Sequence, residues 1–194
     1  DVGTLAGSRT VAIFQPTFSP DGRFLAYISN QSGWDNLYLY EFEEHTHRAL
    51  TTEPVACGAP AGLQGMRTYG FRHDSQGLYY LRNAQGFRRL WYYDLQRGCG
   101  VEAQVDLAEY TFLDQPALAP TRAMLACIAS TPTRPPRLLA VPCKSHERPR
   151  VCRRSASENV PVSELSTPEA LTWPTAGGDL VHGLFYAPSS RRFQ

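Results

Sequence analysis

The chain has 194 residues, of which 42% are hydrophobic, 11% aromatic and 19% charged, and its formal net charge is +1. This composition is that of a globular protein, and the balanced charge gives no electrostatic reason to expect nucleic acid or a membrane as a partner. A bilayer-spanning helix needs about 20 consecutive apolar residues, and no apolar run in the sequence approaches that length. The five cysteines are odd in number and irregularly spaced, which argues against a disulfide framework and predicts a reducing, cytoplasmic location.

The first repeat of the chain predicts four short strands. "QPTFSPDGRFLAYIS" (15–29) has a strand ending at Phe18, a type I turn over Ser19–Gly22 and then an apolar strand. "DNLYLYEF" (35–42) alternates Leu with Tyr, as a strand does, and "HRALTT" (47–52) is a shorter fourth candidate.

The same layout recurs twice further along the chain. "YGFRHDSQGLYYLRN" (69–83) predicts strand, turn and strand, with the turn assigned to Asp74 and Gly77. The later strands of this copy are predicted in "RRLWYYDLQRG" and "VEAQVDL", and those of a weaker third copy in "QPALAPTRAMLACIAS", "RLLAVPC" and "PRVCRRS". The anchor residues Phe18, Phe71 and Leu118 are 53 and 47 residues apart, a spacing typical of four-stranded propeller blades.

The strands also have the two-sided apolar character that a blade requires, because each blade is covered by a neighbour on both faces. "FLAYI" and "LWYY" have no polar face, and their aromatic and β-branched content suits a packed sheet. The best helix candidate, "VPVSELSTPEAL", is interrupted by Pro161 and Pro168. The predicted fold is therefore all-β: a partial β-propeller of about three four-stranded antiparallel blades, near 11–55, 66–108 and 112–157, followed by a short β-hairpin.

Three blades are too few to close a ring, since known propellers have about four to eight. An open arc exposes apolar faces and strand edges at both ends. We therefore expect the chain to be part of a larger propeller, or to associate with a partner such as a second copy of itself in a homo-oligomer.

The repeat resembles a known family. The Phe18–Gly22 turn motif, with "LAY", "NLYL" and "LT" after it, is similar to the repeat of TolB-type propellers and of the propellers in the prolyl oligopeptidase family. The second copy departs from it, because "RHDS" replaces "SPDG", and the third lacks the Asp-Gly pair.

The end of the chain separates the two groups. "EALTWPTAGGDLVHGLFYAP" predicts two strands around a Gly-Gly-Asp turn, a hairpin signal. It resembles the junction in dipeptidyl-peptidase and acylaminoacyl-peptidase members of the prolyl oligopeptidase family, where the last blade leads into an α/β-hydrolase domain. The resemblance implies a propeller portion over 1–165 and, over 166–194, a linker and the first hairpin of a hydrolase domain that is truncated here.

A hydrolase of that family needs Gly-x-Ser-x-Gly followed by Asp and His, and no such pentapeptide occurs in the chain. We therefore assign no catalytic, cofactor-binding or metal-binding residue, leave the substrate-binding residues unassigned, and expect no activity from the chain alone. His182 belongs to the His-Gly junction of the family and is interpreted as a strand histidine with a hydrogen-bond partner.

Other clusters favour structural roles. His45 with His47, and Cys143 with His146, have ligand-like spacing but no second pair of ligands, so no metal is expected. The basic segment 143–154 lacks interleaved aromatic residues and is interpreted as a solvated outer strand and loop. Asp21 and Asp74 are interpreted as turn residues, and the tyrosines and Trp91 of the strands as blade core.

The resemblance implies a propeller segment of a serine peptidase, which gates and docks oligopeptide substrates for a hydrolase domain absent from this chain and uses no cofactor. The alternative is a TolB-like propeller that binds protein and has no enzymatic role. It explains the missing triad but leaves the 171–188 hairpin unexplained.

Overall fold

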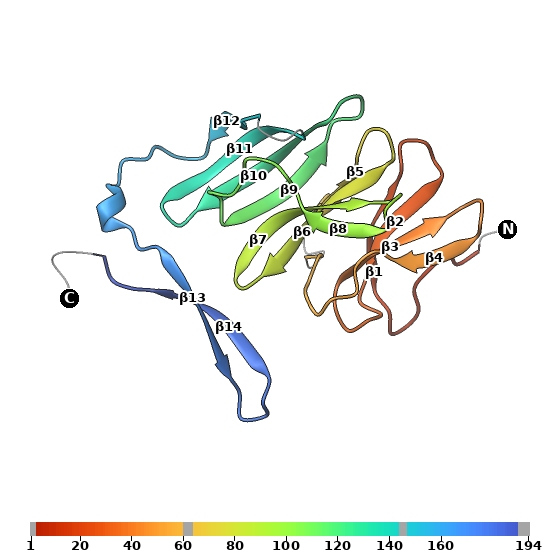
Figure 1. Ribbon diagram of the computed structural model, residues 1–194, viewed down its shortest axis with the longest axis horizontal. Coiled ribbons are helices and arrows are strands. Elements are labelled where there is room, and N and C mark those ends of the chain that lie inside the picture. Colours follow the sequence, from red (N-terminus) through yellow and green to blue (C-terminus); the bar gives the residue numbers. More distant parts are fainter. Residues whose placement is uncertain (1–2, 60–63, 144–146, 190–194) are drawn as a thin grey trace.

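The computed structural model describes residues 3–59, 64–143 and 147–189, and within them the protein is all-β, as predicted. The strands form three antiparallel sheets of four strands and one two-stranded hairpin, which is consistent with a partial propeller and not with a closed barrel (Figure 1). Within these ranges the only helical element is a single 3-10 turn, η1 (Val162–Glu164), so no helix is long enough to cross a bilayer.

Each four-stranded sheet is a simple meander, because its strands are hydrogen-bonded in chain order. The first sheet contains β1 (Ile13–Phe18), β2 (Phe24–Ser29), β3 (Asn36–Glu41) and β4 (Thr46–Ala49). The second contains β5 (Tyr69–Phe71), β6 (Gly77–Ala84), β7 (Phe87–Asp94) and β8 (Cys99–Glu102). The third contains β9 (Phe112–Leu118), β10 (Met124–Thr131), β11 (Arg134–Pro142) and β12 (Arg150–Arg154), and the hairpin contains β13 (Pro168–Pro174) and β14 (Leu180–Tyr186).

The hydrophobic core lies between neighbouring sheets. One cluster joins the first and second sheets around Leu37, Leu39 and Leu78, and a second joins the second and third sheets around Leu113 and Leu139. All five leucines are at most 1% exposed. Burying one such side chain stabilises the fold by about 1.5–3 kcal/mol. The two-sided apolar strands of the sequence are thus explained, because the second sheet is covered on both faces.

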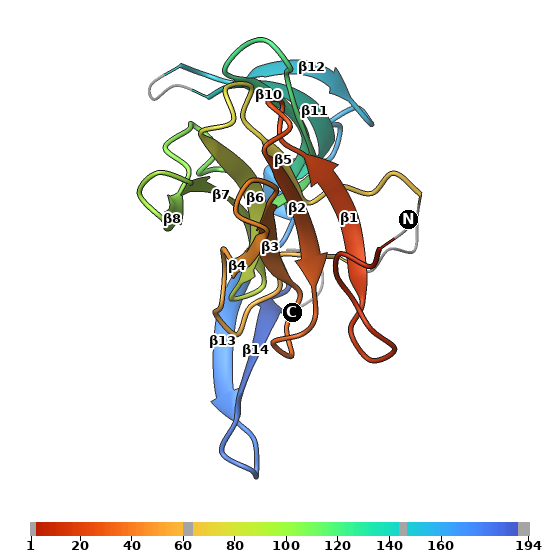
Figure 2. The same cartoon turned by 90° about the vertical axis from the view of Figure 1, so that its right-hand side faces the viewer.

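The first strands of the three sheets come together along one side of the arc. β5 contacts both β1 and β9, and Figure 2 shows the end of β1 close to β5. Gly70 permits the approach of β5 to β9, since a Cβ at this position would lie 2.7 Å from Cδ2 of Leu118. This arrangement makes β1, β5 and β9 the inner strands of the arc.

Two details differ from the prediction. The turn of the second repeat closes at Ser75, whose φ is 59° and whose backbone N–H donates to the carbonyl of Arg72; Gly77 instead begins β6. Ser75 therefore takes the place that Gly22, with φ of 74°, occupies in the first repeat. The predicted fourth strand "VEAQVDL" is also shifted, because β8 ends at Glu102 and the following residues form the crossover to the third sheet.

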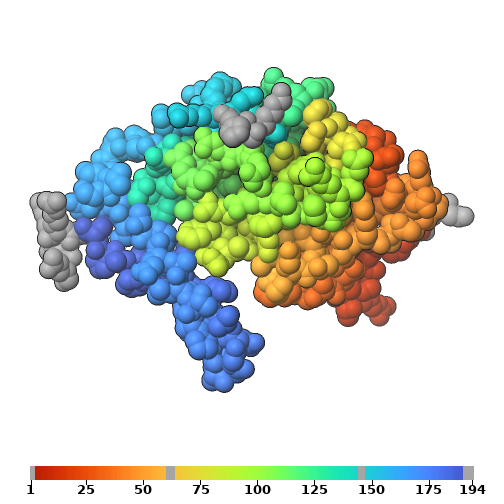
Figure 3. Space-filling model, viewed as in Figure 1, coloured from red at the N-terminus to blue at the C-terminus, as the bar shows by residue number. Residues whose placement is uncertain are grey.

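The linker after the third sheet is held by an ion pair. Arg137, only 7% exposed, pairs with Glu158, and the Nε of Arg154 lies 3.3 Å from the same carboxylate. The chain then forms η1, in the segment of the helix candidate, and enters β13. The hairpin extends from the sheets as a separate arm, visible in Figures 1 and 3, with Trp173, Leu180 and Phe185 about half exposed or more.

Candidate functional site

The inner strands line a groove. It has a volume of about 940 Å³ and is bordered by β1, β5 and β9 and by the segment that precedes β5. This volume is near the upper end of the range of ligand pockets, about 300–1,000 Å³. Its lining includes Gln15, Phe18, Arg67, Tyr69, His73 and Leu118.

Two Gln-Pro dipeptides form matching irregularities in this groove. Gln15 in β1 has φ of 55° and Gln115 in β9 has φ of 51°, and the strand register shifts at both places. A residue with a side chain rarely adopts such a φ, and strained residues of this kind cost about 1–3 kcal/mol each. The strain is therefore held by interactions that the two side chains make with the second sheet.

Both glutamine side chains bind the segment just before β5. The Oε1 of Gln15 accepts hydrogen bonds from the backbone N–H and the hydroxyl of Thr68, at 2.8 and 3.1 Å. The Oε1 of Gln115 accepts one from the backbone N–H of Arg67 at 3.1 Å. The adjacent amides of Arg67 and Thr68, just before the second sheet begins, are thus held by the first and the third sheet at once.

Tyr69 completes this junction. Its hydroxyl lies 2.8 Å from the carbonyl oxygen of Ala26 in β2 and also contacts the carbonyl oxygen of Gln15 at the bulge. Burial raises the pKa of Tyr69 well above its ordinary value, so the hydroxyl stays protonated and can donate. The bulge of the first sheet and the inner strand of the second are therefore one connected polar unit.

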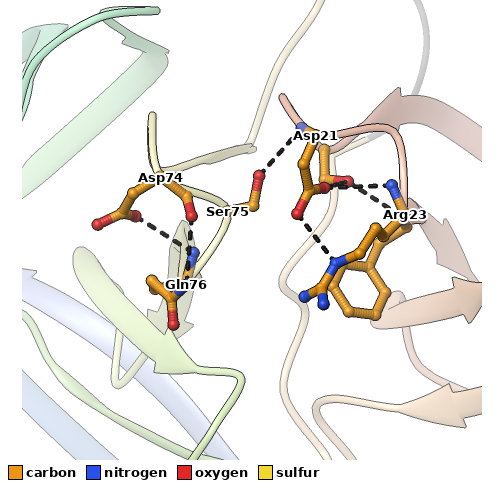
Figure 4. Close-up of polar contacts among 7 residues, drawn as sticks. Asp21, Arg23, Asp74, Ser75 and Gln76 are labelled. Atoms are coloured by element: carbon orange, nitrogen blue, oxygen red, sulfur yellow. Dashed lines mark hydrogen bonds and ion pairs between the residues drawn. The ribbon is translucent and has the colours of Figure 1, made fainter.

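A second contact between the sheets lies at their first turns, as Figure 4 shows. The backbone N–H of Asp21 donates to the Oγ of Ser75 at 3.2 Å. Burial alone would raise the pKa of Asp21, but hydrogen bonds from Ser19, Arg23 and Ser75, with the Arg23 charge, bring that pKa below its ordinary value. Ser75 stands at the position of Gly22 in the first repeat, and its side-chain oxygen accepts a hydrogen bond that a glycine could not accept.

Asp21 and Asp74 are turn residues, as predicted. The Oδ1 of Asp21 accepts the backbone N–H of Arg23 at 3.1 Å, and that of Asp74 accepts the N–H of Gln76 at 3.2 Å. Figure 4 shows both contacts. The link from Asp21 to the next sheet was not predicted.

Three histidines, His45, His47 and His182, make structural contacts. His45 and His47 hydrogen-bond to the hydroxyls of Tyr40 and Tyr27 at 3.0 and 2.8 Å. The Nδ1 of His182 lies 2.9 Å from the Thr172 hydroxyl across the hairpin, which confirms the interpretation of His182 as a strand histidine with a partner. His146, paired with Cys143 in the metal hypothesis, lies outside the described residues.

No potential metal site is present within the described ranges, since they contain no group of three or more His, Cys, Asp or Glu side chains that could hold an ion. In the same ranges, no histidine hydrogen-bonds to a serine or a cysteine, so the arrangement offers no activated nucleophile. What the structure provides is a groove with hydrogen-bond donors and apolar walls, which is suited to bind a ligand.

The two Gln-Pro bulges and the groove were not predicted from the sequence. A signal was present, because Gln15-Pro16 and Gln115-Pro116 lie three residues before the anchors Phe18 and Leu118. A dipeptide repeated at the same place in two blades indicates a shared backbone feature.

Comparisons with known proteins give the fold a context. No family model matches the chain, and no curated protein matches it either. Among solved structures, a puromycin-hydrolysing peptidase of Mycobacterium tuberculosis is 25% identical, with a TM-score of 0.76 over 93% of this chain and 26% of its own.

A puromycin hydrolase is 20% identical, with a TM-score of 0.80 over 100% of this chain and 28% of its own. Its S511A mutant complexed with PGG is also 20% identical, with a TM-score of 0.77 over 95% and 27%. The chain therefore spans about a quarter of the length of the solved structures it matches.

The three four-stranded sheets, with the groove along their inner strands, define the chain as a β-propeller segment followed by a hairpin. The structural neighbours then show which known proteins share this fold. They are peptidases of the prolyl oligopeptidase family, and this chain corresponds to their propeller region, which confirms the resemblance predicted from the repeat and the hairpin.

Proposed function

We propose that the chain is the propeller segment of a prolyl-oligopeptidase-type serine peptidase, in which it restricts access to, and docks, oligopeptide substrates. The observation that carries the proposal is that the hairpin β13–β14 follows the third sheet in a fold matched over its whole length by a puromycin hydrolase, at a TM-score of 0.80. Catalysis would belong to an α/β-hydrolase domain encoded outside these residues, and the division into 1–165 and 166–194 is part of this proposal.

The hairpin supports this reading through its exposed apolar residues. Trp173 is 48% exposed, Leu180 64% and Phe185 50%. A free-standing hairpin of two strands is marginally stable at best in water. These side chains are suited to be covered by further strands of a hydrolase sheet, whose first hairpin this would be.

The hairpin approaches the propeller at one position. Gly86, in the turn between β6 and β7, faces Leu184 of β14, since a Cβ on Gly86 would come within 2.8 Å of the leucine side chain. A catalytic domain continuing from β14 would therefore begin at the edge formed by the turns between second and third strands. Substrates would pass this edge and the inner strands before cleavage.

The test is to read the coding sequence downstream of Gln194 and to produce the extended protein that it encodes. We expect the downstream frame to encode Gly-x-Ser-x-Gly, then Asp and His, and the extended protein to react with a serine-directed fluorophosphonate probe and to cleave short chromogenic peptides. The 194-residue chain serves as the control and should remain unlabelled. A frame without this motif, or labelling of a serine in the control, would contradict the proposal.

The second candidate is a TolB-like propeller that binds protein and has no enzymatic role. One observation favours it: the face of the third sheet that points away from the second exposes Ile128 and Leu138, which pair across β10 and β11 and form an apolar surface open to a partner. The same surface suits a further blade of a complete propeller or a second copy of the chain. An extended protein that lacks the triad and binds a protein partner through this sheet would support the second candidate; cytoplasmic location is proposed for either.

A further inference from the structure

The inner-strand groove carries positive charge without a balancing acid. Arg67 lines it with an exposed side chain, and none of the described lining residues is acidic. Arg67 forms no ion pair with any described residue, whereas Arg72, Arg82 and Arg88 of the same sheet pair with Asp74, Glu53 and Asp114. A guanidinium that is accessible and unpaired in a groove is suited to bind an anion, above all a planar carboxylate.

The backbone that carries Arg67 is held in place from two sheets. Its N–H donates to Gln115, and the N–H and hydroxyl of Thr68 donate to Gln15. Both glutamines adopt a left-handed backbone conformation to reach this segment. Strain of this kind is concentrated at functional sites, where it fixes a group before the ligand arrives, and a fixed group loses less entropy on binding.

A second donor is present at the groove. The Oε1 of Gln15 is committed to donors from Thr68, which fixes the orientation of the amide and leaves the Nε2 as the remaining donor. This Nε2 is buried and has no hydrogen-bond partner among the described residues. Buried polar atoms are normally paired, so an orphan beside a groove indicates a ligand acceptor such as a peptide carbonyl.

The rest of the groove is apolar. Phe71, Met66 and Leu118 line it together with Pro16 and Pro116. Such walls, next to one cation and one amide donor, fit an apolar side chain adjacent to a carboxylate and a peptide carbonyl. These three features occur together at the C-terminus of a peptide.

We propose that the groove binds the C-terminal carboxylate of a short peptide whose last residue is apolar, with Arg67 as the carboxylate ligand. Gln15 and Gln115 are positioning residues that hold the Arg67 segment. The inference rests on the proposed function, because that function supplies peptides as the ligand class. Recognition of the carboxylate would select short, free-ended peptides over internal segments of folded proteins.

The test compares two peptides that differ in one group. A fluorescently labelled tetrapeptide ending in leucine is prepared as the free acid and as the C-terminal amide, and its binding to the 194-residue chain is followed by fluorescence anisotropy. We expect the acid to bind about tenfold more tightly than the amide, since a hydrogen bond from the guanidinium is stronger to a charged carboxylate than to a neutral amide. The preference should weaken as salt is added, because an exposed guanidinium is screened.

Substitutions assign the effect to Arg67. R67Q should abolish the preference for the acid, R67K should restore part of it, and R97Q serves as a control because Arg97 is exposed outside the groove. Circular dichroism would establish that R67Q remains folded, which we expect because the side chain of Arg67 makes no hydrogen bond or ion pair with the described residues. Equal binding of acid and amide, a preference that survives in R67Q, or no binding of either peptide would each overturn the inference.

The two proposals can fail separately. An extended protein that cleaves peptides but shows no acid preference would remove the carboxylate site and leave the propeller of a peptidase intact. An extended protein without the catalytic motif, whose groove still prefers the acid through Arg67, would remove the peptidase and leave a peptide-binding groove.

Discussion

Replacing Tyr69 by phenylalanine should remove the polar link between the first and second sheets without leaving a large cavity. The side chain is 2% exposed, and its hydroxyl contacts the carbonyl oxygens of Ala26 and Gln15. A hydroxyl has one hydrogen, so the substitution removes one donor that two buried acceptors share. Leaving a buried acceptor unpaired costs about 1–3 kcal/mol, and we expect a loss of unfolding free energy in that range.

Urea unfolding of the chain, followed by circular dichroism and tryptophan fluorescence, measures this loss. Tyr38→Phe is the matched control, because Tyr38 is 5% exposed and its hydroxyl has no hydrogen-bond partner among the described residues. The control should change the unfolding free energy by less than about 0.5 kcal/mol. Equal effects of the two substitutions would show that the Tyr69 hydroxyl does not link the sheets.

Three further outcomes are expected. Gly77→Ala should destabilise the chain by about 1–3 kcal/mol or more, because its Cβ would lie 2.4 Å from the Tyr93 carbonyl oxygen, whereas Gly3→Ala, with open space around it, should leave the melting temperature unchanged. A thiol reagent should label the exposed Cys99 at once and the buried Cys57 only after unfolding, which mass spectrometry of the labelled peptides would check. Burial raises the pKa of Cys57 from 9.0 to about 11, so the stability contributed by the protonated thiol is complete below pH 9 and is lost between pH 9 and 11. The unfolding free energy of Cys57→Ala should therefore fall less steeply over this range, by about 1.4 kcal/mol per pH unit. An unchanged slope would contradict this.

The sheets were predictable because their cause is local. A strand that is covered on both faces needs apolar or aromatic residues at successive positions, and the runs 24–28 and 37–40 have them. A turn between such strands needs a residue that tolerates a left-handed backbone, and Gly22 fulfils this need within four residues of Phe18. Period and turn chemistry therefore locate the strands and their order from one short window at a time.

The turn of the second repeat shows where this reasoning fails. Glycine preference pointed to Gly77, yet the left-handed position is taken by Ser75. The serine is retained by a contact 54 residues away, since its Oγ accepts the backbone N–H of Asp21. Gly77 is required for another long-range reason, the close passage of the Tyr93 carbonyl. Local propensity cannot reveal either cause, because both arise only when sheets or strands meet.

The groove, too, depends on contacts between sheets that local sequence patterns do not reveal. Its charged residue comes from the second repeat, and the two side chains that fix that residue's segment come from the first and the third. Each glutamine is unremarkable in its own strand, and its strained conformation has no sequence signal except the proline that follows it. A site built from three repeats that are about 50 residues apart leaves no local motif in the sequence. The catalytic serine motif Gly-x-Ser-x-Gly, in contrast, is contained in five consecutive residues. The propeller could therefore be identified from the sequence, while the residues that would bind a ligand could be found only after the inner strands were placed together.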